Sequence, residues 1–475
     1  MSHLLFNDSF INGEFYSTDK NFSVDDPATQ QSIIMVSDVD DIGVHKAINT
    51  AHDAFIKLKL TNATTRSNVL MRWYDLVMQN KQTLAELMTK EQGKPLKEAL
   101  GEVDYGAAFI KWYAEQAKRS YGDVIPATDN NHRLTSFKQP VGVVAGITPW
   151  NFPIAMVTRK VAPAYAAGCS FVLKPSEHTP LCALALAYLA DQAGFEKGAF
   201  NVLLSEDAPR VGKILTESNI VRKFTFTGST GVGKQLLTQC ASTVKRTSME
   251  LGGNAPFIIF DNADLDEAVT GLMGAKFRNG GQTCVAANRI FVQRSILDQV
   301  VDKLAKKVAT LKVGNGCDEN TDIGPLIYPK AKQKVQELVA DAKAKGAIQI
   351  SDDVQLVGSF QAPLILTGVN PKMDIYHQEV FGPVVSIIVF DEEAEVLALA
   401  NDVPYGLAAY FYSQNIKQIY RVSEALEYGM VGINEGLISN PVAPFGGVKQ
   451  SGLGREGGYQ GLDEYLEEKY VCIKL

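Results

Sequence analysis

The regular alternation of short apolar strands with helices, from residue 141 onward, constrains the fold of this chain more than any other feature. A parallel strand needs a crossover connection, usually a helix, before the next strand can pair with it. The pattern therefore predicts a mostly parallel α/β sheet covered by helices on both faces. The expected elements are strands at "VGVVAGI" (141–147), "SFVLKP" (170–175), "FNVLL" (200–204) and "RKFTFTG" (222–228), with helices at 154–167, 178–193, 209–218 and from 231.

A second cycle of the same kind begins at "PFIIF" (256–260). Its expected helices lie near 264–278, 295–311 and 329–345, and its further strands are "RIFVQ" and "VVSIIVF". At 475 residues the chain is too long for one simple core, so we expect two α/β domains joined near 250–255. Residues 43–118, which precede both cycles, carry apolar positions at helical spacing and are expected to be mostly helical.

The segment "YGDVIPATDNNHRLTSFKQP" (121–140) interrupts this helical region with short β-type stretches and turn residues. We interpret it as an excursion from the main body. The tail "KYVCIKL" is also β-rich, and it could pair with the excursion in the same subunit or in a neighbouring one.

Composition excludes several classes of protein. The net charge is −7, from 46 basic and 53 acidic residues, and no long basic block is present, which argues against nucleic acid or an anionic membrane surface as the main partner. The longest apolar run, "LCALALAYLA", is too short to cross a bilayer, and the first residues do not resemble a secretory signal. The six cysteines are scattered, so we expect no disulfide framework, no metal site and a reducing, cytoplasmic location.

The most conspicuous glycine-rich motif is "FTGSTGVGKQLL". Gly228, Gly233 and Lys234 are spaced as in a P-loop, but Gln235 stands where that loop needs a hydroxyl for Mg²⁺, which disfavours a nucleotide triphosphatase. The glycines do not match the G-x-G-x-x-G dinucleotide pattern either. A strand that ends at Gly228 and Ser229 and leads into a helix still offers free N–H groups to a phosphate. The spacing leaves a phosphate site and a simple turn equally open.

Three further polar positions follow expected strands. Lys174 in "VLKPSEHTP" lies where open α/β sheets bind ligands, and Glu177 could accept hydrogen bonds from ribose hydroxyls, although both could simply begin a helix. Glu250 in "SMELGGNAP" could have a raised pKa that suits a general base, although an ordinary strand-end glutamate is the commoner case. Asn151 in "PWNFP" could donate to an oxyanion or could be a structural turn residue.

One cysteine has unusual neighbours. Cys284 in "FRNGGQTCVAANR" follows small and amide residues that allow close approach of another molecule, and it lacks apolar neighbours in the sequence. The alternative is a small buried thiol, and the other five cysteines are interpreted as structural. A thiol, a carboxylate, an amide and a phosphate-binding turn at strand ends of two adjoining domains together favour an enzyme with a nucleophilic cysteine.

Six motifs in this order resemble the aldehyde dehydrogenase superfamily: "PWNFP", "FTGSTGVGK", "MELGGNAPFIIF", "GGQTC", "QEVFGPVV" and "PFGGVKQSGLGRE". The resemblance covers essentially the whole chain. Within the superfamily, "FRNGGQTC", "ALEYGMVGINEG", "LISNPVAPFGG" and "YLEEKYVCIKL" are most similar to the succinate-semialdehyde group. The resemblance implies a Rossmann-like cofactor domain (1–120 and 141–251), an α/β catalytic domain (252–455) and a small β oligomerisation arm (121–140 and 456–475), in a homodimer or homotetramer.

The resemblance also assigns roles to residues. It implies that Cys284 is the nucleophile, that Glu250 is the general base, and that Asn151 and the N–H of Cys284 form the oxyanion hole. The implied cofactor-binding residues are Trp150, Lys174, Glu177, Gly228, Ser229, Leu251, Glu379 and Phe381. Members that prefer NADP tend to have a small residue in place of Glu177, so we expect NAD to be preferred.

The implied reaction is the NAD-dependent oxidation of succinate semialdehyde to succinate, through a thioester that water hydrolyses. Relatives that transfer the acyl group to coenzyme A usually lack a glutamate at the position of Glu250. Arg159, Arg278 and Ser439 match residues that would hold the substrate carboxylate, unless the arginines only make internal ion pairs. Glutarate semialdehyde remains an alternative substrate, because one methylene changes selectivity little.

Two readings from other classes remain. A cysteine hydrolase without cofactor would need a histidine partner, and none of the six histidines stands in a recognisable pairing motif. A non-catalytic binding protein is disfavoured by the complete set of Cys284, Glu250 and Asn151. Ala286 stands where several relatives carry a second cysteine, so a regulatory disulfide with Cys284 is not expected.

Overall fold

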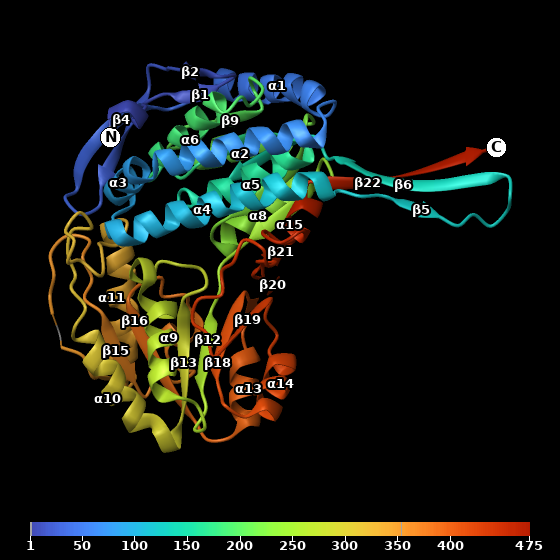
Figure 1. The fold of residues 1–475 in the computed structure, drawn as a ribbon. Helices are drawn as coiled ribbons and strands as arrows, with labels where there is room; N and C mark the ends of the chain where they lie inside the picture. The colour runs from blue at the N-terminus through green and yellow to red at the C-terminus, as the bar shows by residue number, and fades with distance from the viewer. Residues whose placement is uncertain (1, 353) are drawn as a thin grey trace.

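The computed structural model describes residues 2–352 and 354–475 as two α/β halves with a long arm that projects from the body (Figure 1). The first half contains an eight-stranded sheet. Its order is β2 (Glu14–Tyr16), β1 (Ser9–Ile11), β9 (Phe200–Val202), β8 (Ser170–Lys174), β7 (Val143–Ile147), β10 (Val221–Thr227), β11 (Arg246–Glu250) and β21 (Gly452–Leu453). The five strands from β9 to β11 are parallel to one another, which confirms the expected mostly parallel sheet.

The strand order reverses between β7 and β10. From β7 the chain proceeds outward through β8 and β9, then returns to the other side of β7 to form β10 and β11. In open α/β sheets such a reversal opens a crevice at the carboxyl ends of the two central strands, where ligands bind. Asn151 follows β7 and Gly228 follows β10, so both candidate residues lie at this crevice.

Helices cover both faces of the first sheet, and the sequence of β7 shows why. Val144 belongs to the apolar cluster formed with α2 (Ala63–Gln79), α3 (Lys81–Gln92), α4 (Leu96–Gln116), α5 (Ala155–Ala167) and α6 (Leu181–Gln192). Val143 and Ala145 belong to the cluster on the other face, with α1 (Asp41–Leu58), α7 (Ala208–Glu217) and α8 (Thr230–Ala241). Successive side chains of a strand point to opposite faces, so a strand that is apolar throughout must be covered on both.

The second half contains a seven-stranded sheet. Its order is β14 (Ile348–Gln349), β15 (Leu364–Thr367), β16 (Val384–Phe390), β13 (Ala287–Gln293), β12 (Ala255–Ile259), β18 (Ala408–Tyr412) and β19 (Met430–Ile433). The surrounding helices include α9 (Leu265–Phe277), α10 (Leu297–Val308), α11 (Pro329–Ala344), α13 (Glu393–Asn401) and α14 (Ile416–Ala425). All strand pairs except β14 with β15 are parallel, as the second cycle of strands and helices predicts.

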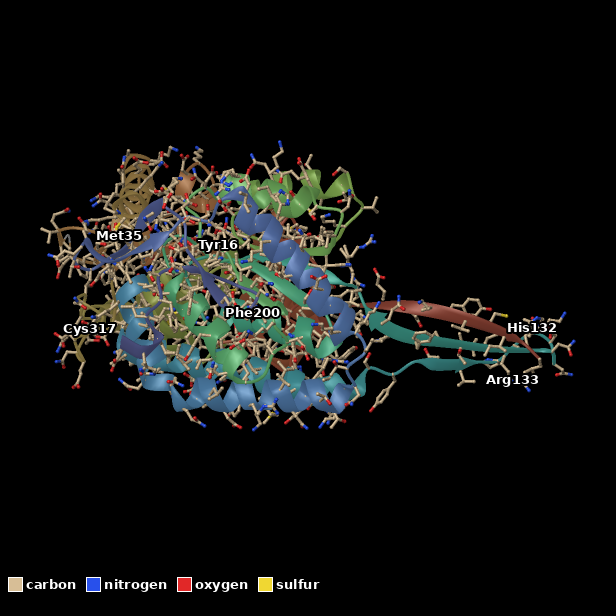
Figure 2. The ribbon with its side chains drawn as sticks, turned by 90° about the horizontal axis from the view of Figure 1, so that it is seen from above. Tyr16, Met35, His132, Arg133, Phe200 and Cys317 are labelled. Carbon is tan, nitrogen blue, oxygen red and sulfur yellow. The ribbon has the colours of Figure 1, made fainter. Side chains whose placement is uncertain are left out.

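The arm is a three-stranded antiparallel sheet of β5 (Asp123–Ile125), β6 (His132–Pro140) and β22 (Leu466–Lys474). The C-terminal strand pairs with β6 of the same subunit along its full length, from Leu466 opposite Pro140 to Lys474 opposite His132. The tail therefore pairs with the excursion within one chain, which decides a question that the sequence leaves open. His132 and Arg133 lie at the far end of the arm (Figure 2).

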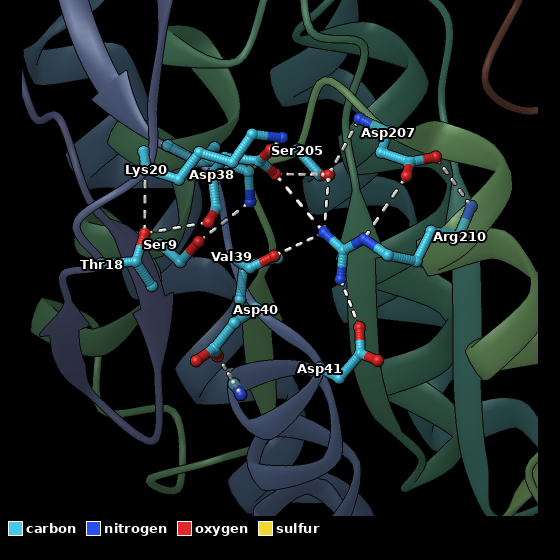
Figure 3. Close-up of polar contacts among 12 residues, drawn as sticks. Ser9, Thr18, Lys20, Asp38, Val39, Asp40, Asp41, Ser205, Asp207 and Arg210 are labelled. Carbon is cyan, nitrogen blue, oxygen red and sulfur yellow. Dashed lines mark hydrogen bonds and ion pairs between the residues drawn. The ribbon is translucent and has the colours of Figure 1, made fainter.

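A buried carboxylate joins the N-terminal strands to the helices beside them (Figure 3). Asp38 accepts hydrogen bonds from Lys20 at 2.5 Å and from the hydroxyl of Ser205 at 2.7 Å. Arg210 of α7 reaches the same carboxylate at 3.5 Å and donates to the backbone carbonyl of Val39 at 2.6 Å. This network connects the segment before α1 to the loop that follows β9 and precedes α7.

The cysteines divide into two groups, which corrects one expectation. Cys169, Cys182 and Cys240 are buried, as structural thiols should be, but Cys317 and Cys472 are exposed. Apolar neighbours in the sequence did not make Cys472 a buried thiol, because its strand β22 belongs to the projecting arm, where little of the chain covers it. In the part of the chain that the structure describes, no helix is long and apolar enough to cross a membrane.

Glu102 of α4 links the helical layer to the start of α5. Its buried carboxylate accepts hydrogen bonds from the N–H groups of Ile154 at 2.9 Å and Ala155 at 3.2 Å, and it pairs with the buried ammonium of Lys94. A carboxylate at a helix N-terminus satisfies N–H groups that have no partner within the helix.

Replacing the buried carboxylate of Glu102 should lower the free energy of unfolding far more than replacing a surface carboxylate on the same helix. We expect Glu102→Ala to lower the free energy of unfolding by about 3–5 kcal/mol, because Lys94 then lacks a counter-charge in the interior. Asp104→Ala removes an exposed pair with Lys81 and should cost at most about 1 kcal/mol. Urea denaturation at one fixed protein concentration measures both; equal losses would show that the buried pair is not structurally important.

Candidate active site

A cavity of about 590 Å³ lies at the crevice and is lined by residues of both halves. The first half contributes Trp150, Asn151, Gly228, Ser229, Glu250 and Leu251, and the second half contributes Cys284, Glu379 and Phe381. Nine of the residues that the sequence singles out are thus brought together from distant parts of the chain. Tyr328 and Lys334 also line the cavity, but nothing in their local sequence pointed to them.

The turn before Cys284 is built from residues in the left-handed backbone region. Asn279, Gly280 and Gly281 have φ angles of 53°, 62° and 77°. A Cβ atom on Gly281 would lie 2.3 Å from the carbonyl oxygen of Gly382, so only glycine fits this close backbone approach. The run of small and amide residues in the sequence therefore has a steric cause, which is to present Cys284 to the cavity at the end of α9.

The thiol of Cys284 is partly covered by apolar side chains of the second half, which corrects the expectation that it lacks apolar company. Burial raises the pKa of Cys284 to about 12; the cations Arg159 and Arg278 act against this rise, while Glu379 and Glu250 add to it. The resting side chain is therefore a protonated thiol at neutral pH. A thiolate forms only when a base takes the proton or when a positive charge comes near.

Glu250 occupies the last position of β11 and is buried. Neither of its carboxylate oxygens has a hydrogen-bond partner among the residues that the structure describes. Burial raises the pKa of Glu250 well above its usual value, as the sequence suggested, and the negative charge of Glu456 raises it further against the opposing Arg159 and Lys160. An unpartnered carboxyl of this kind can accept a proton from a water molecule that enters the cavity.

A buried charge cluster that the sequence did not reveal lies behind Glu250. The carboxylate of Glu456 pairs with both Arg159 and Lys160 of α5. The guanidinium of Arg159 also lies 4.1 Å from the ring centre of Phe445, and Lys160 donates to the hydroxyl of Thr227 at 2.7 Å. Arg159 thus makes the internal ion pair that was the alternative to a substrate contact, although its Nη2 has no hydrogen-bond partner among the described residues.

Asn151 is fixed from three sides. Its side-chain Nδ2 donates to the backbone carbonyl of Gln282 at 3.0 Å. Its backbone carbonyl accepts hydrogen bonds from Lys94 Nζ at 2.8 Å and from the side-chain amide of Asn279 at 2.9 Å. An asparagine amide carries two N–H groups, so one remains for an oxyanion near the thiol. Gln282, which holds Asn151 in place, is a positioning residue whose role its sequence alone did not indicate.

The cavity wall beside α8 suits a dinucleotide. Ser229 precedes α8 without bonding to its N–H groups, so these remain available to a phosphate, and the buried hydroxyl of Thr230 has no partner in the described chain. The rings of Trp150 and Phe381 lie edge to face at 5.5 Å. One carboxylate oxygen of Glu379 has no hydrogen-bond partner among the described residues, so it could accept a hydrogen bond from a ribose hydroxyl. These unpartnered groups fit the cofactor that the resemblance implies.

Glu379 and Lys276 form an unexpected pair of neighbours. Burial raises the pKa of Glu379 to about 7 and lowers the pKa of Lys276 to about 7, and each charge partly offsets the shift of the other. The Nζ of Lys276 is fully buried and has no hydrogen-bond partner among the described residues. The sequence gives no sign that Lys276 is buried, because a lysine in a helix such as α9 is ordinarily exposed to solvent.

Lys174 and Glu177 lie at the carboxyl end of β8, outside the lining of the main cavity. The ammonium of Lys174 is buried and donates to the carboxylate of Glu177 at 3.0 Å. The attraction of Lys174 lowers the pKa of Glu177 against the effect of burial. Glu177 is therefore ionised at neutral pH, and about one third of its side chain is exposed, at 34%.

Arg278 and Ser439 line a second, much smaller cavity on the other side of Cys284, together with Thr283 and Tyr410. Arg278 is half-buried and lies 5.1 Å from the ring centre of Phe152. It forms no ion pair and no hydrogen bond with any residue that the structure describes. The Glu98 carboxyl is close enough to be influenced by Arg278 but forms no ion pair with it. A cation without an ion-pair partner, close enough to lower the pKa of Cys284, can receive an anionic group of a substrate.

The buried, protonated state of Cys284 makes its alkylation strongly pH-dependent. Because the thiolate is the reactive form, the rate of iodoacetamide addition should rise about tenfold per pH unit between pH 7 and 9. Arg278→Gln removes a charge that lowers the pKa, so the rate at pH 8 should fall roughly threefold. Arg294→Gln, at a surface ion pair with Asp391, is the control. Mass spectrometry of the Cys284 peptide separates it from Cys317 and Cys472; a pH-independent rate would contradict the raised pKa.

No cluster of metal-ligating side chains is present among the described residues. The model of the aldehyde dehydrogenase family matches residues 15–471. Over 469 residues the chain is 51% identical to a glutarate-semialdehyde dehydrogenase of Pseudomonas putida, with 98% of both chains covered. A 3-sulfolactaldehyde dehydrogenase of Pseudomonas putida is 52% identical, covering 99% of this chain and 97% of the relative.

Further matches agree with these. A succinate-semialdehyde dehydrogenase of Escherichia coli named for NADP(+) is 49% identical over 100% of this chain and 99% of its own. The crystal structure of succinate-semialdehyde dehydrogenase from Burkholderia pseudomallei matches with a TM-score of 0.98 and 50% identity, over 100% of this chain and 99% of that one. The fold, the enzyme class and the resemblance seen in the sequence are confirmed, and the chain belongs to the aldehyde dehydrogenase family.

Proposed function

We propose that this aldehyde dehydrogenase oxidises a short aldehyde that carries an acidic group at its far end, with succinate semialdehyde and NAD as its preferred pair. The observation that carries the proposal is the guanidinium of Arg278, which has no ion-pair partner and lines the small cavity together with Thr283, the residue before Cys284. Burying a carboxylate is costly unless a cation or several donors receive it. Arg278 and Ser439 line the same small cavity and supply such a partner, whereas Arg159 lines neither cavity and is paired with Glu456.

The chemistry begins at Cys284. Its thiolate adds to the aldehyde carbon, and the oxygen becomes an oxyanion that the free N–H of Asn151 and the backbone N–H of Cys284 stabilise. The nicotinamide cofactor, when bound at the α8 side of the cavity, supplies the acceptor for the substrate hydride. Loss of hydride leaves the acyl group attached to the sulfur as a thioester.

Glu250 then acts on the thioester. Its unpartnered carboxylate takes a proton from a water molecule, and the oxygen of that water attacks the acyl carbon. The C–S bond then breaks, which releases the carboxylic acid and returns the sulfur of Cys284 as a thiolate. Burial and the negative charge of Glu456 both raise the pKa of Glu250, while Arg159 and Lys160 lower it, so the net effect is a pKa well above the usual value. The raised pKa of Glu250 predicts that the hydrolytic step speeds up as pH rises.

The preference for NAD rests on Glu177. An ionised carboxylate beside the adenosine ribose would accept hydrogen bonds from the ribose hydroxyls and would repel a 2′-phosphate. The Escherichia coli relative, 49% identical to this chain, is named for NADP(+), so membership of the family does not decide between the two cofactors. Glutarate semialdehyde is the second candidate substrate, because the Pseudomonas putida relative is named for it.

Self-association is a further part of the proposal. The arm projects from the body (Figure 1) and exposes large apolar side chains, among them Val124, Phe137, Tyr470 and Ile473. Apolar side chains on an extended sheet with free strand edges favour pairing with another copy of the chain. We infer a homodimer or homotetramer. A cytoplasmic or other reducing location is consistent with six free cysteines.

The substrate proposal is tested by the rate of reduced-cofactor formation with succinate semialdehyde, glutarate semialdehyde and an uncharged aldehyde, each with NAD⁺ and NADP⁺. We expect the highest kcat/KM with succinate semialdehyde and NAD⁺. Arg278→Gln should lower kcat/KM for both acidic aldehydes by about 10- to 100-fold, because a charge-assisted contact is lost, and should change the uncharged aldehyde little. Arg294→Gln is the control. Equal losses on all three aldehydes would exclude Arg278 as the carboxylate partner.

The role of Glu250 is tested separately by rapid mixing. Glu250→Gln should still give a burst of about one reduced cofactor per active site, because the thioester forms without the base. Steady-state turnover should then fall by about 10²–10⁴-fold. Glu393→Gln, at an exposed pair with Arg421, should behave as the unsubstituted enzyme. Loss of the burst together with turnover would show that Glu250 acts before the thioester forms.

A further inference from the structure

The residue after Glu177 is a histidine, and the two side chains are in contact range. The Nε2 of His178 lies 3.9 Å from one carboxylate oxygen of Glu177, while Lys174 donates to the other oxygen at 3.0 Å. The carboxylate on which the NAD preference rests is therefore flanked by one fixed cation and one titratable group. His178 is 41% exposed at its side chain, so a ligand beside Glu177 can reach it.

His178 is also connected to the main cavity. Its ring centre lies 5.1 Å from that of Tyr328, and Tyr328 lines the cavity and lies 6.5 Å from Trp150. His178 thus stands at the rim, between the cavity wall and Glu177. The adenosine end of a dinucleotide whose phosphates lie at the start of α8 would extend toward this rim.

The charged groups around His178 are few. Glu177 and the more distant Asp25 favour its protonation, Lys174 opposes it, and Tyr328 packs against its ring. Burial lowers the pKa of His178 below its ordinary value, so the ring is neutral at pH 7 and above. Burial lowers the pKa of Lys174, and the carboxylates of Asp38 and Asp207 act against this shift. Both aspartates belong to the network shown in Figure 3.

We propose that the charge of His178 sets how strongly this enzyme discriminates between nicotinamide dinucleotides with and without a 2′-phosphate. The inference rests on the proposed position of the adenosine ribose beside Glu177. With a neutral ring, a 2′-phosphate meets the Glu177 carboxylate compensated only by Lys174. With a protonated ring, Lys174 and His178 together outweigh Glu177, and the phosphate meets net positive charge.

Thermodynamic linkage makes this reciprocal. If a protonated His178 favours the phosphorylated dinucleotide, then binding of that dinucleotide must raise the pKa of His178 and take up a proton. Selectivity should therefore shift toward NADP⁺ as pH falls. The phosphate of NADP⁺ itself loses charge near pH 6, which acts in the opposite direction and has to be separated by a control variant.

The experiment measures the ratio of kcat/KM for NADP⁺ to that for NAD⁺ between pH 5.5 and 8.5. Effects of pH on the chemistry common to both cofactors cancel in this ratio. Relative to His178→Gln, the ratio of the unsubstituted enzyme should rise about three- to tenfold as pH falls across this range. His178→Lys should show a raised ratio at pH 8.5. His132→Gln, at the far end of the arm (Figure 2), is the matched control.

Binding gives a second readout, which is independent of turnover. Calorimetry at pH 6 in two buffers of different ionisation enthalpy should show more proton uptake on NADP⁺ binding by the unsubstituted enzyme than by His178→Gln, because protons exchanged by the phosphate itself are common to both proteins, and NAD⁺ should give no such difference. Superimposable pH curves for the unsubstituted enzyme and His178→Gln, or no difference in proton uptake, would overturn the inference alone. Absence of turnover with both cofactors would instead overturn the proposed function.

Discussion

The ion pairs of Glu456 with Arg159 and Lys160 are the interaction on which the rest of the site depends. They join the C-terminal segment to α5, and they place three charges in the interior directly behind Glu250. A buried charge is tolerated only when it is paired, so removal of any member leaves the others uncompensated. The same cluster acts on Glu250 and on Cys284, since Arg159 lowers the pKa of both.

The titratable groups in and near the main cavity share a resting state that carries little charge. Burial raises the pKa values of Cys284, Glu250 and Glu379, and it lowers that of Lys276, so each is shifted toward its neutral form. Neutral groups can lie in a low-dielectric cavity without counter-ions. Charge would then develop only when the substrate and cofactor bring their own dipoles and charges, which couples ionisation of the site to occupation.

The two anion-recognition regions differ in how their charges are arranged. Arg278 has no ion-pair partner in the described chain, although the Glu98 carboxyl lies close enough to be influenced by it, whereas Glu177 stands between Lys174 and His178. An unpaired cation favours binding of any small acid group of the right reach, which agrees with the range of acidic aldehydes for which the relatives are named. A compensated carboxylate gives selectivity that depends on small changes in the charges around it.

The sequence by itself determined the two mostly parallel sheets, the arm, and the positions of Asn151, Gly228 and Glu250 at or just after strand ends, because hydrophobic periodicity and turn residues act locally. Cys284, expected at a strand end, lies instead in the turn between α9 and β13. Its motifs also led to the family. Only the tertiary structure decided which distant charges meet: Glu456 with Arg159 and Lys160, and Lys276 near Glu379. Burial depth and the partners contributed by remote segments set these interactions, and neither is encoded in a local pattern.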